Sequence, residues 1–472
     1  MRRLVPPHLE GRGPVPADTS NVAEEHRLLT DGAVLLLDAE GSTELAARLR
    51  ARGTLGAEPL DVLLDKIFAR VVDTVFAFGG YIGHFTGDGV IAVFPGEPAV
   101  TVANAIEAAR VILEHLHRLS GIVTAAGPVE LAVRAVVGAG SIDTFVWRAR
   151  SITSMDQQNA TYVIVGDALT EAHAGELRVV GGALGLGPAA VAAVPGGPYV
   201  PLSDVDNGLD GTGGGGAGLA HRYVKVDLDR LTRRPADPTS ATSASTCTGS
   251  SRTDNDWRFV IPQAFDETIA PEFRDASVLF LELREWPHED TVAVILEQAA
   301  ASGGHISNIL RTSSRQRGIT FMLLWGAPTG HVDDATRTLE FVEAVQHEIG
   351  IDGFKTGAVY SHMFIGFVGS DAQSTYTAIG APVNLAARLC DLASWGEIRV
   401  TEAFDEVVPS HWAVESVVAT LYKGFGTPLV TRSLRPSGSY APRRRTEPGR
   451  QAETPSPAVA LPEHTSGAGP PE

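Results

Sequence analysis

Cysteine and long apolar runs are both scarce in this 472-residue sequence. Its two cysteines, Cys247 and Cys390, lie far apart, so the sequence predicts no disulfide framework and favours a reducing, cytoplasmic location. No apolar run approaches the ~20 residues of a membrane-spanning helix. The first residues are basic but have no apolar segment after them, so we expect no signal peptide.

Basic residues are outnumbered by acidic ones, 38 against 56, which gives a formal net charge of −18. So acidic a chain is poorly suited to gripping nucleic acid through its phosphates, and an anionic membrane surface would repel it. A polyanionic ligand such as a nucleoside triphosphate would therefore need a metal ion or a local group of cations. Apolar residues make up 44% of the chain, enough for two or three ordinary domains with sizeable cores.

Low-complexity segments divide the chain. Residues 211–218 are almost all glycine, and residues 235–256 are rich in Ser, Thr, Ala and Pro, a composition typical of flexible connections. The end is proline-rich and includes a run of three arginines, which we interpret as part of a solvated tail. The predicted division is an irregular N-terminus (1–28), a first domain (29–205), a flexible linker (206–274), a second domain (275–436) and a disordered tail (437–472).

Hydrophobic periodicity predicts the same series of elements in each half. In the first half the series is strand, helix, helix, hairpin, helix, strand, at residues 32–37, 42–50, 60–78, 81–85 with 90–94, 99–120 and 131–137. The second half repeats it, without a counterpart of the helix at 42–50, at residues 277–281, 292–302, 305–310 with 319–325, 333–348 and 356–360. We expect an α+β fold, a duplicated domain with helices on one side of a mainly antiparallel sheet.

The first candidate for chemistry is Asp38, at the end of a strand, with a turn of small residues after it. The free backbone N–H groups of a helix N-terminus suit phosphate, and the aspartate can hold a magnesium ion that neutralises it. The turn comprises Ala39, Glu40, Gly41, Ser42 and Thr43. An ordinary helix N-cap is the alternative interpretation.

The second candidate is Asp88, between two glycines at the tip of the first hairpin. Asp-Gly is a strong signal for a tight turn, which is the alternative interpretation. In this topology the strand that ends at Asp38 lies beside the hairpin, so the two carboxylates can converge. Two carboxylates that share a pair of ions suit an in-line attack on phosphorus.

The third candidate lies in the second half, where Asn384 and Arg388 are four residues apart and share one helix face. Arg388 could stabilise charge that develops on a transferring phosphate, and Asn384 could orient a ribose. Their spacing is equally that of a surface polar pair on an amphipathic helix.

In combination, these segments resemble class III adenylate and guanylate cyclases over about residues 30–205 and 275–435. Residues 37–43 resemble the first metal motif of that family, 79–88 the second, and 376–389 with 395–398 the transition-state helix and the following strand. The tandem arrangement is most similar to the bicarbonate-responsive soluble adenylyl cyclases. The resemblance implies two ferredoxin-like (βαββαβ) domains that form an intramolecular pseudo-heterodimer in a monomeric chain.

The resemblance also implies an unequal division of the site. Asp38 and Asp88 fill the family's positions for two Mg²⁺ or Mn²⁺ ions, whereas the second domain has Glu282 and Ile319 there. Asn384 and Arg388 fill the catalytic positions of the second domain, and the first domain has Thr170 and Ala174 instead. The halves would therefore complete one catalytic site and leave one degenerate site.

Other positions depart from the family pattern. Asn308 stands where adenylyl cyclases have a base-selecting lysine, and its partner position is Thr377. His84 and His173 stand where a lysine and an arginine would bind bicarbonate; each histidine could give a pH response or be structural. Lys423 resembles a phosphate-contacting lysine, though a solvated loop lysine is the alternative.

The sequence therefore predicts a nucleotide cyclase of intracellular signalling, which converts ATP in preference to GTP into the 3′,5′-cyclic nucleotide and pyrophosphate. Its partners would be nucleotide and metal ions, without nucleic acid or membrane. The alternative hypothesis is a catalytically weak or inactive cyclase-homology module that binds nucleotide and regulates.

Overall fold

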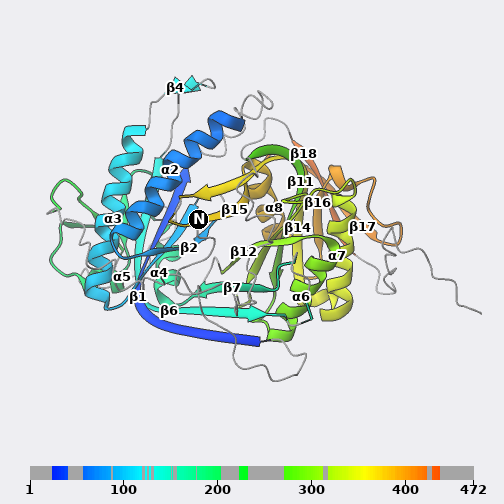
Figure 1. Ribbon diagram of the computed structural model, residues 1–472, viewed down its shortest axis with the longest axis horizontal. Helices are drawn as coiled ribbons and strands as arrows, with labels where there is room; N and C mark the ends of the chain where they lie inside the picture. The colour runs from blue at the N-terminus through cyan, green and yellow to red at the C-terminus, as the bar shows by residue number, and fades with distance from the viewer. Residues whose placement is uncertain are drawn as a thin grey trace, which may run out of the picture. The chain divides into compact units, whose positions relative to one another are not determined.

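The structure is a computed structural model that describes most of both halves of the chain. The described residues are 24–40, 57–86, 89–119, 123–124, 127–128, 132–149, 151–152, 157–176, 178–202, 223–231, 271–311, 317–370, 372–422 and 428–435. Within them each half of the chain forms one large mixed sheet with its helices (Figure 1).

The first sheet has the strand order β2-β3-β1-β6-β8-β10-β9, with β7 paired to β6. Neighbouring strands within this sheet run antiparallel, except for β6 and β8, which run parallel to each other. The bounds are β1 (Glu24–Glu40), β2 (Tyr81–Phe85), β3 (Gly89–Pro95), β6 (Ala132–Arg148), β7 (Ala160–Val165), β8 (Leu184–Leu186), β9 (Tyr199–Pro201) and β10 (Val224–Val226). A separate two-residue pair, β4 (Val123–Thr124) and β5 (Gly127–Pro128), lies outside this sheet.

The second sheet repeats the first strand for strand, in the order β12-β13-β11-β14-β16-β18-β17 with β15 paired to β14. The duplication predicted from the sequence is therefore confirmed. The bounds are β11 (Glu272–Leu283), β12 (His305–Leu310), β13 (Thr320–Trp325), β14 (Phe354–Gly369), β15 (Ser374–Ile379), β16 (Ile398–Thr401), β17 (Ala413–Thr420) and β18 (Leu429–Arg435).

Helices cover both faces of each sheet, and the expectation of helices on one side is wrong. The run Ala33–Leu37 of β1 is buried on both faces: Ala33, Leu35 and Leu37 pack with α2 and α3, whereas Val34 and Leu36 pack with α4. A continuous apolar run, rather than strict alternation, is what a strand covered on both faces requires. The first-half helices are α2 (Ala57–Ala77), α3 (Pro98–Leu119), α4 (Asp167–Glu176) and α5 (Pro188–Ala193), with α2 and α3 in contact (Figure 1).

The same two-sided arrangement occurs in the second half. Leu279 and Leu281 of β11 belong to the core that contains α6 and α7, whereas Val278 and Phe280 belong to the one that contains α8. The helices are α6 (Glu289–Ser302), α7 (Asp334–Ile349) and α8 (Ala381–Leu392), with short 3₁₀ turns η7 (Ile351–Gly353) and η8 (Glu402–Phe404).

Three boundaries differ from those expected. β1 begins at Glu24, so residues 24–28 are strand rather than irregular, because they pair with the far end of β6. β10 lies inside the expected linker and belongs to the first sheet, since Val224 and Val226 are buried and pair with β8 and β9. β11 begins at Glu272, before the expected start of the second domain at 275.

Two long strands extend well past their predicted ends and connect the halves. The sequence predicts that β6 ends at 137, but it continues to Arg148; β14, expected to end at 360, continues to Gly369. Trp147 on the first extension is buried in the core of the second half. Phe364 and Val368 on the second extension are buried in the core of the first half. Each half thus buries side chains of the other in its core.

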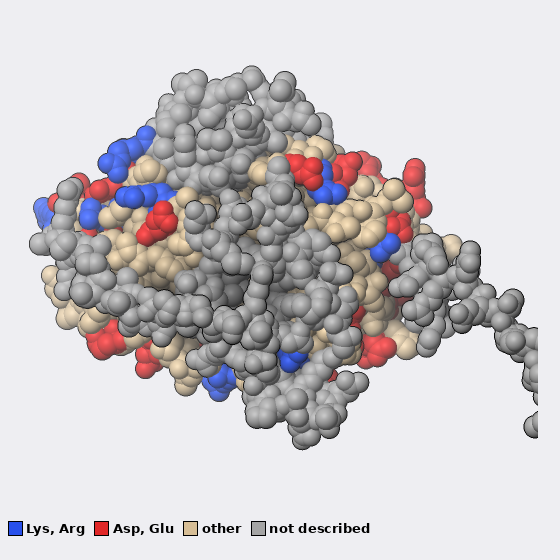
Figure 2. Space-filling view, viewed as in Figure 1, with Lys and Arg blue, Asp and Glu red and all other residues tan. Residues whose placement is uncertain are grey.

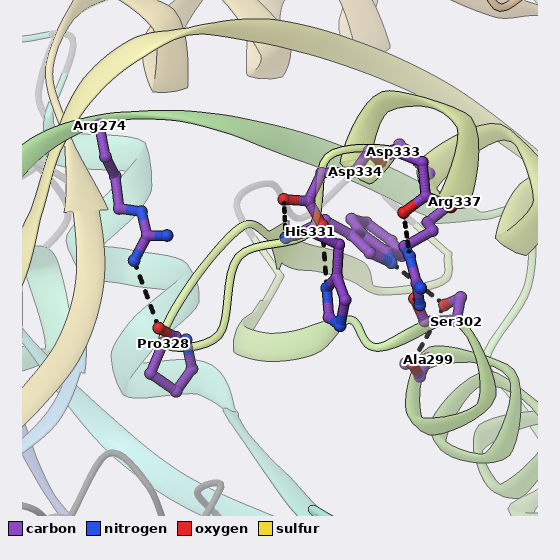
Figure 3. A network of polar contacts seen from close by, with 10 residues as sticks. Arg274, Ala299, Ser302, Pro328, His331, Asp333, Asp334 and Arg337 are labelled. Carbon is purple, nitrogen blue, oxygen red and sulfur yellow. Dashed lines mark hydrogen bonds and ion pairs between the residues drawn. The ribbon is translucent and has the colours of Figure 1, made fainter. Parts of the chain in front are cut away.

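A polar network holds the loop before α7 (Figure 3). The buried Asp334 carboxylate accepts the His331 backbone N–H at 2.8 Å. Arg337 forms an ion pair with Asp333 at 2.7 Å and donates to the Ser302 carbonyl at 3.2 Å, which ties α7 to the end of α6. Figure 3 shows these side chains converging between the two helices.

Replacing the buried Asp334 with alanine should lower the free energy of unfolding by about 1–3 kcal/mol, because it leaves the partly buried His331 N–H without its acceptor. Chemical denaturation of the full chain measures this. The exposed Glu415→Ala change is the control, and we expect a change below about 0.5 kcal/mol there. Equal stability of the two variants would mean that the network does not hold the α7 loop.

Candidate functional site

Asp38 lies near the end of β1, beside the predicted hairpin. Its register partners are Gly89 on β3 and Arg134 on β6. The carboxylate is partly exposed, with 27% of its side chain accessible, and forms an ion pair with Arg134 at 3.0 Å. The sequence interpretation missed Arg134, although the register of two adjacent strands places a cation beside Asp38.

The residue after Asp88 lies against the strand that carries Asp38. Asp88 itself lies outside the described residues, but Gly89 directly follows it and pairs with Asp38. A Cβ atom on Gly89 would lie 2.9 Å from the Leu37 carbonyl oxygen, so glycine permits this close approach. The chain therefore brings the neighbour of Asp88 to the end of β1.

The other phosphate-binding candidates are described in part or not at all. Ala39 and Glu40 continue β1 in register with β6, so the predicted turn begins at least two residues later than expected. Gly41, Ser42, Thr43 and Lys423 lie outside the described residues.

Asn384 and Arg388 share α8, which begins after Gly380, a residue with φ +123°. Both side chains are partly exposed, as a surface that meets a ligand requires. The helix packs closely on β14: a Cβ atom on Gly357 would lie 2.2 Å from the Cys390 backbone nitrogen. The corresponding positions of α4 in the first half are Thr170 and Ala174, as aligned from the sequence.

The second half has no equivalent of the Asp38 and Asp88 pair among its described residues. Glu282 takes the place of Asp38 and forms an ion pair with Lys355 at 3.1 Å. Glu282 pairs with Thr320, so the counterpart of Asp88 is Ile319, which is fully buried. At these two positions the second half therefore has one acidic residue, whereas the first half has Asp38 and Asp88 in its sequence.

The segment after the strand also differs between the halves. Residues 41–56 separate β1 from α2, whereas only residues 284–288 separate β11 from α6. Within this short segment Trp286 packs against Phe145, with ring centroids 4.7 Å apart, and against Trp147 at 6.0 Å. The short segment of the second half therefore carries an aromatic contact between the halves.

Asn308 and Thr377 line one polar cavity together with residues of the first half. Its lining is Gly83, His84, Phe85, Tyr162, Ser307, Asn308, Gln373, Ser374, Thr375 and Thr377, and it encloses about 20 Å³. That is room for about one water molecule, so a purine would enter only after side chains move.

Both ends of the Asn308 amide are engaged. Its Nδ2 donates to the Phe85 carbonyl at 2.7 Å, and its Oδ1 accepts the Ile309 backbone N–H at 2.9 Å. The hydroxyls of Ser307 and Thr377 are 2.9 Å apart. The Phe85 contact joins the second half to the strand that leads, three residues later, to Asp88.

His84 is a buried, neutral group in the same cavity. Its ring stacks on Tyr162 with centroids 4.9 Å apart, and burial lowers the pKa of His84 to about 3. Burial therefore favours the uncharged imidazole, which supports the structural interpretation of His84 over a pH response. The Nδ1 atom of His173 on α4 lies 3.4 Å from the Oε2 atom of Glu176.

Charges on the described surface are mixed. On the face in Figure 2, acidic and basic side chains are scattered among neutral ones, in keeping with a chain that carries both signs and an excess of acid. No described helix is long and apolar enough to cross a membrane.

Comparison with solved structures shows which known folds this chain resembles. Over 82% of this chain and 86% of its own, a class III adenylyl cyclase-like ATP-binding protein from Pseudomonas aeruginosa superposes with a TM-score of 0.50 at 12% identity. Single cyclase domains match a little over a third of this chain. The guanylyl cyclase Cya2 covers 36% of this chain and 96% of its own (22% identity, TM-score 0.29). The adenylyl cyclase CyaB from P. aeruginosa covers 37% and 98% (19% identity, TM-score 0.31).

No protein-family model matches the sequence, and no curated protein matches it. The likeness therefore concerns the fold, which is that of two tandem class III cyclase-like domains.

Proposed function

We propose that the chain is a class III-type nucleotide cyclase, which converts ATP in preference to GTP into the 3′,5′-cyclic nucleotide and pyrophosphate. The observation that carries the proposal is the 2.7 Å hydrogen bond from Asn308 to Phe85. It links the half that holds Asn384 and Arg388 to the strand leading to Asp88. In this proposal the two halves would contribute complementary groups to one site.

Asp38 and Asp88 are the groups that would hold two Mg²⁺ or Mn²⁺ ions. Asp38 suits this role because its carboxylate is partly exposed near the end of a strand. A metal ion would have to replace Arg134 as the partner of that carboxylate. When bound, the ions supply activation of the ribose 3′-hydroxyl and neutralisation of phosphate charge. Arg134 would then be able to contact the triphosphate.

The remaining groups orient the substrate. Arg388 would stabilise charge that develops on the α-phosphate, and Asn384 would position the ribose. The backbone of residues 39–43 and the Lys423 side chain would bind the outer phosphates. Asn308 and Thr377 would contact the base once the cavity opens.

A regulatory, nucleotide-binding module is the second candidate. It is favoured by the engagement of both ends of Asn308 and by the ion pair that Asp38 already forms with Arg134. The solved structure that covers 82% of this chain is itself an ATP-binding, cyclase-like protein.

Incubation of the full chain with ATP or GTP and Mn²⁺, with products separated by chromatography, tests the proposal. A cyclase should give cyclic nucleotide and pyrophosphate in equal amounts. Binding of nucleotide, measured by calorimetry, without detectable product would establish the regulatory module instead.

Asn308 is the variant that reports on base selection. We expect Asn308→Lys to change the ratio of kcat/KM for ATP and GTP by about 10-fold or more, since one hydrogen bond to a base edge is worth about 1–3 kcal/mol. The exposed Arg317→Ala change is the control. An unchanged ratio in a variant that still turns over would remove Asn308 from the base site.

The same proposal covers oligomeric state and location. We expect a monomer, because the halves already pair within one chain, and a cytoplasmic protein. The sequence resemblance to bicarbonate-responsive soluble cyclases rests on the tandem order. Because burial favours an uncharged His84, which offers no charge for bicarbonate, we expect no bicarbonate activation.

A further inference from the structure

Two edge strands face the partner half with backbone groups that their own sheets leave unsatisfied. β2 ends the first sheet and β12 ends the second, and each carries a bulge, between Ile82 and His84 and between Ile306 and Asn308. An edge strand exposes N–H and C=O groups on its outer side. When such groups are buried they need partners from elsewhere.

A glutamine from the opposite half satisfies the β2 edge. The Gln373 Oε1 atom accepts the Ile82 N–H at 3.0 Å, and its Nε2 donates to the Ile82 carbonyl at 2.7 Å. Gln373 is 4% exposed and directly precedes β15. Its side-chain amide thus forms the pair of hydrogen bonds that another strand would form; we call this arrangement the Gln373 clamp.

A second glutamine does the same at the β12 edge. Gln158 Oε1 accepts the Ile306 N–H at 3.0 Å, and Nε2 donates to the Ile306 carbonyl at 3.2 Å. Gln158 is 6% exposed, and its Oε1 also lies 3.1 Å from His305 Nδ1. The two clamps occur at corresponding bulges of the two halves, so the arrangement repeats across the pseudo-symmetry.

The two clamps act on different hairpins. Ile82 lies six residues before Asp88, on the hairpin that carries a proposed metal ligand. Ile306 lies on the equivalent hairpin of the second half. There the position of Asp88 is taken by Ile319, whose side chain cannot bind a metal ion. We propose that Gln158 and Gln373 are positioning residues that fix the register of the two halves, and that Gln373 alone thereby positions the Asp88 hairpin for metal binding. The second clause rests on the proposed function.

Amide hydrogen exchange on the full chain tests the clamps independently of activity. Gln373→Leu should speed exchange of the Ile82 amide by about tenfold or more and leave the Ile306 amide unchanged; Gln158→Leu should do the reverse. Gln157→Leu, next to one clamp, is the control that should alter neither amide. Unchanged exchange at both amides in folded variants would overturn the clamps.

Gln373→Glu gives a second test, which can be used even if the leucine variant is too unstable to study. A protonated carboxyl has one donor and one acceptor, so it can pair with both Ile82 groups, whereas the ionised form cannot donate to the carbonyl. Burial raises the pKa of the introduced carboxyl. The ionised carboxylate still accepts the Ile82 N–H but is repelled by the Ile82 carbonyl oxygen that Nε2 contacts in the wild type. Protection of the Ile82 amide, taken relative to its intrinsic exchange rate at each pH, should therefore be near wild type at low pH and decrease as the pH rises through that raised pKa. Protection independent of pH would contradict the clamp geometry.

Metal binding tests the positioning role. Titration with Mn²⁺, followed by the electron paramagnetic resonance signal of the free ion, should give a half-saturating concentration about tenfold higher for Gln373→Leu and less than about threefold higher for Gln158→Leu. Equal shifts in the two variants would overturn the assignment of Gln373 to the hairpin. If the wild-type chain binds no Mn²⁺, the proposed function fails, and amide exchange still decides whether the clamps exist.

Discussion

Replacing Asp38 with alanine is expected to lower turnover by more than about 100-fold, because even outer-shell groups around a metal commonly cost about 10–100-fold. The fold should survive, since the carboxylate lies at a partly exposed strand end. Cyclic-nucleotide production at saturating Mn²⁺ measures the effect, and circular dichroism verifies the fold. Asp88→Ala should behave in the same way.

The pseudo-symmetric Glu282→Ala change is the matched control for Asp38→Ala. Both residues lie near the ends of equivalent strands, and both form an ion pair with a cation on the adjacent strand of the sheet, Arg134 or Lys355. The register partner of Asp38 is Gly89, which directly follows Asp88, whereas the register partner of Glu282 is Thr320, which follows Ile319. Because Ile319 cannot supply a second carboxylate beside Glu282, Glu282→Ala should leave turnover within about threefold of wild type. A Glu282 variant as inactive as the Asp38 variant would mean that the site lies in the other half.

Replacing Arg388 with alanine is expected to lower kcat by about 10²–10³-fold with little change in nucleotide affinity. Losing one electrostatic contact to charge that develops in the transition state typically has this cost. Calorimetric nucleotide binding and steady-state kinetics on the same preparation separate the two quantities. The exposed Arg317→Ala change in the same half is the control for loss of a positive charge.

Two results would contradict the role of Arg388. A rise in the nucleotide dissociation constant equal to the fall in kcat/KM, with kcat unchanged, would make Arg388 an ordinary binding residue. Wild-type kinetics would show that the face of α8 that carries Asn384 and Arg388 does not meet the reacting phosphate.

The elements with strong local signals were correctly predicted. The hairpin strand 81–85 coincides with β2, and the strand 305–310 coincides with β12, because glycine pairs end the preceding helices and short apolar runs follow. The four-residue spacing places Asn384 and Arg388 on one helix, as predicted. The long extensions of β6 and β14 were not predicted. Their residues are buried against the opposite half of the chain, and such contacts leave no amphipathic pattern in the local sequence.

The sequence by itself determined the duplication, the fold class and the unequal distribution of acidic and basic candidates, since each depends on local pattern or on residue identity at aligned positions. The tertiary structure decided what those side chains meet. It placed Arg134 beside Asp38, engaged both ends of Asn308, and made His84 neutral through burial. It also paired Gln158 and Gln373 with backbone groups more than about a hundred residues away. Such contacts depend on strand register and on the packing of one half against the other, and no local sequence pattern encodes them.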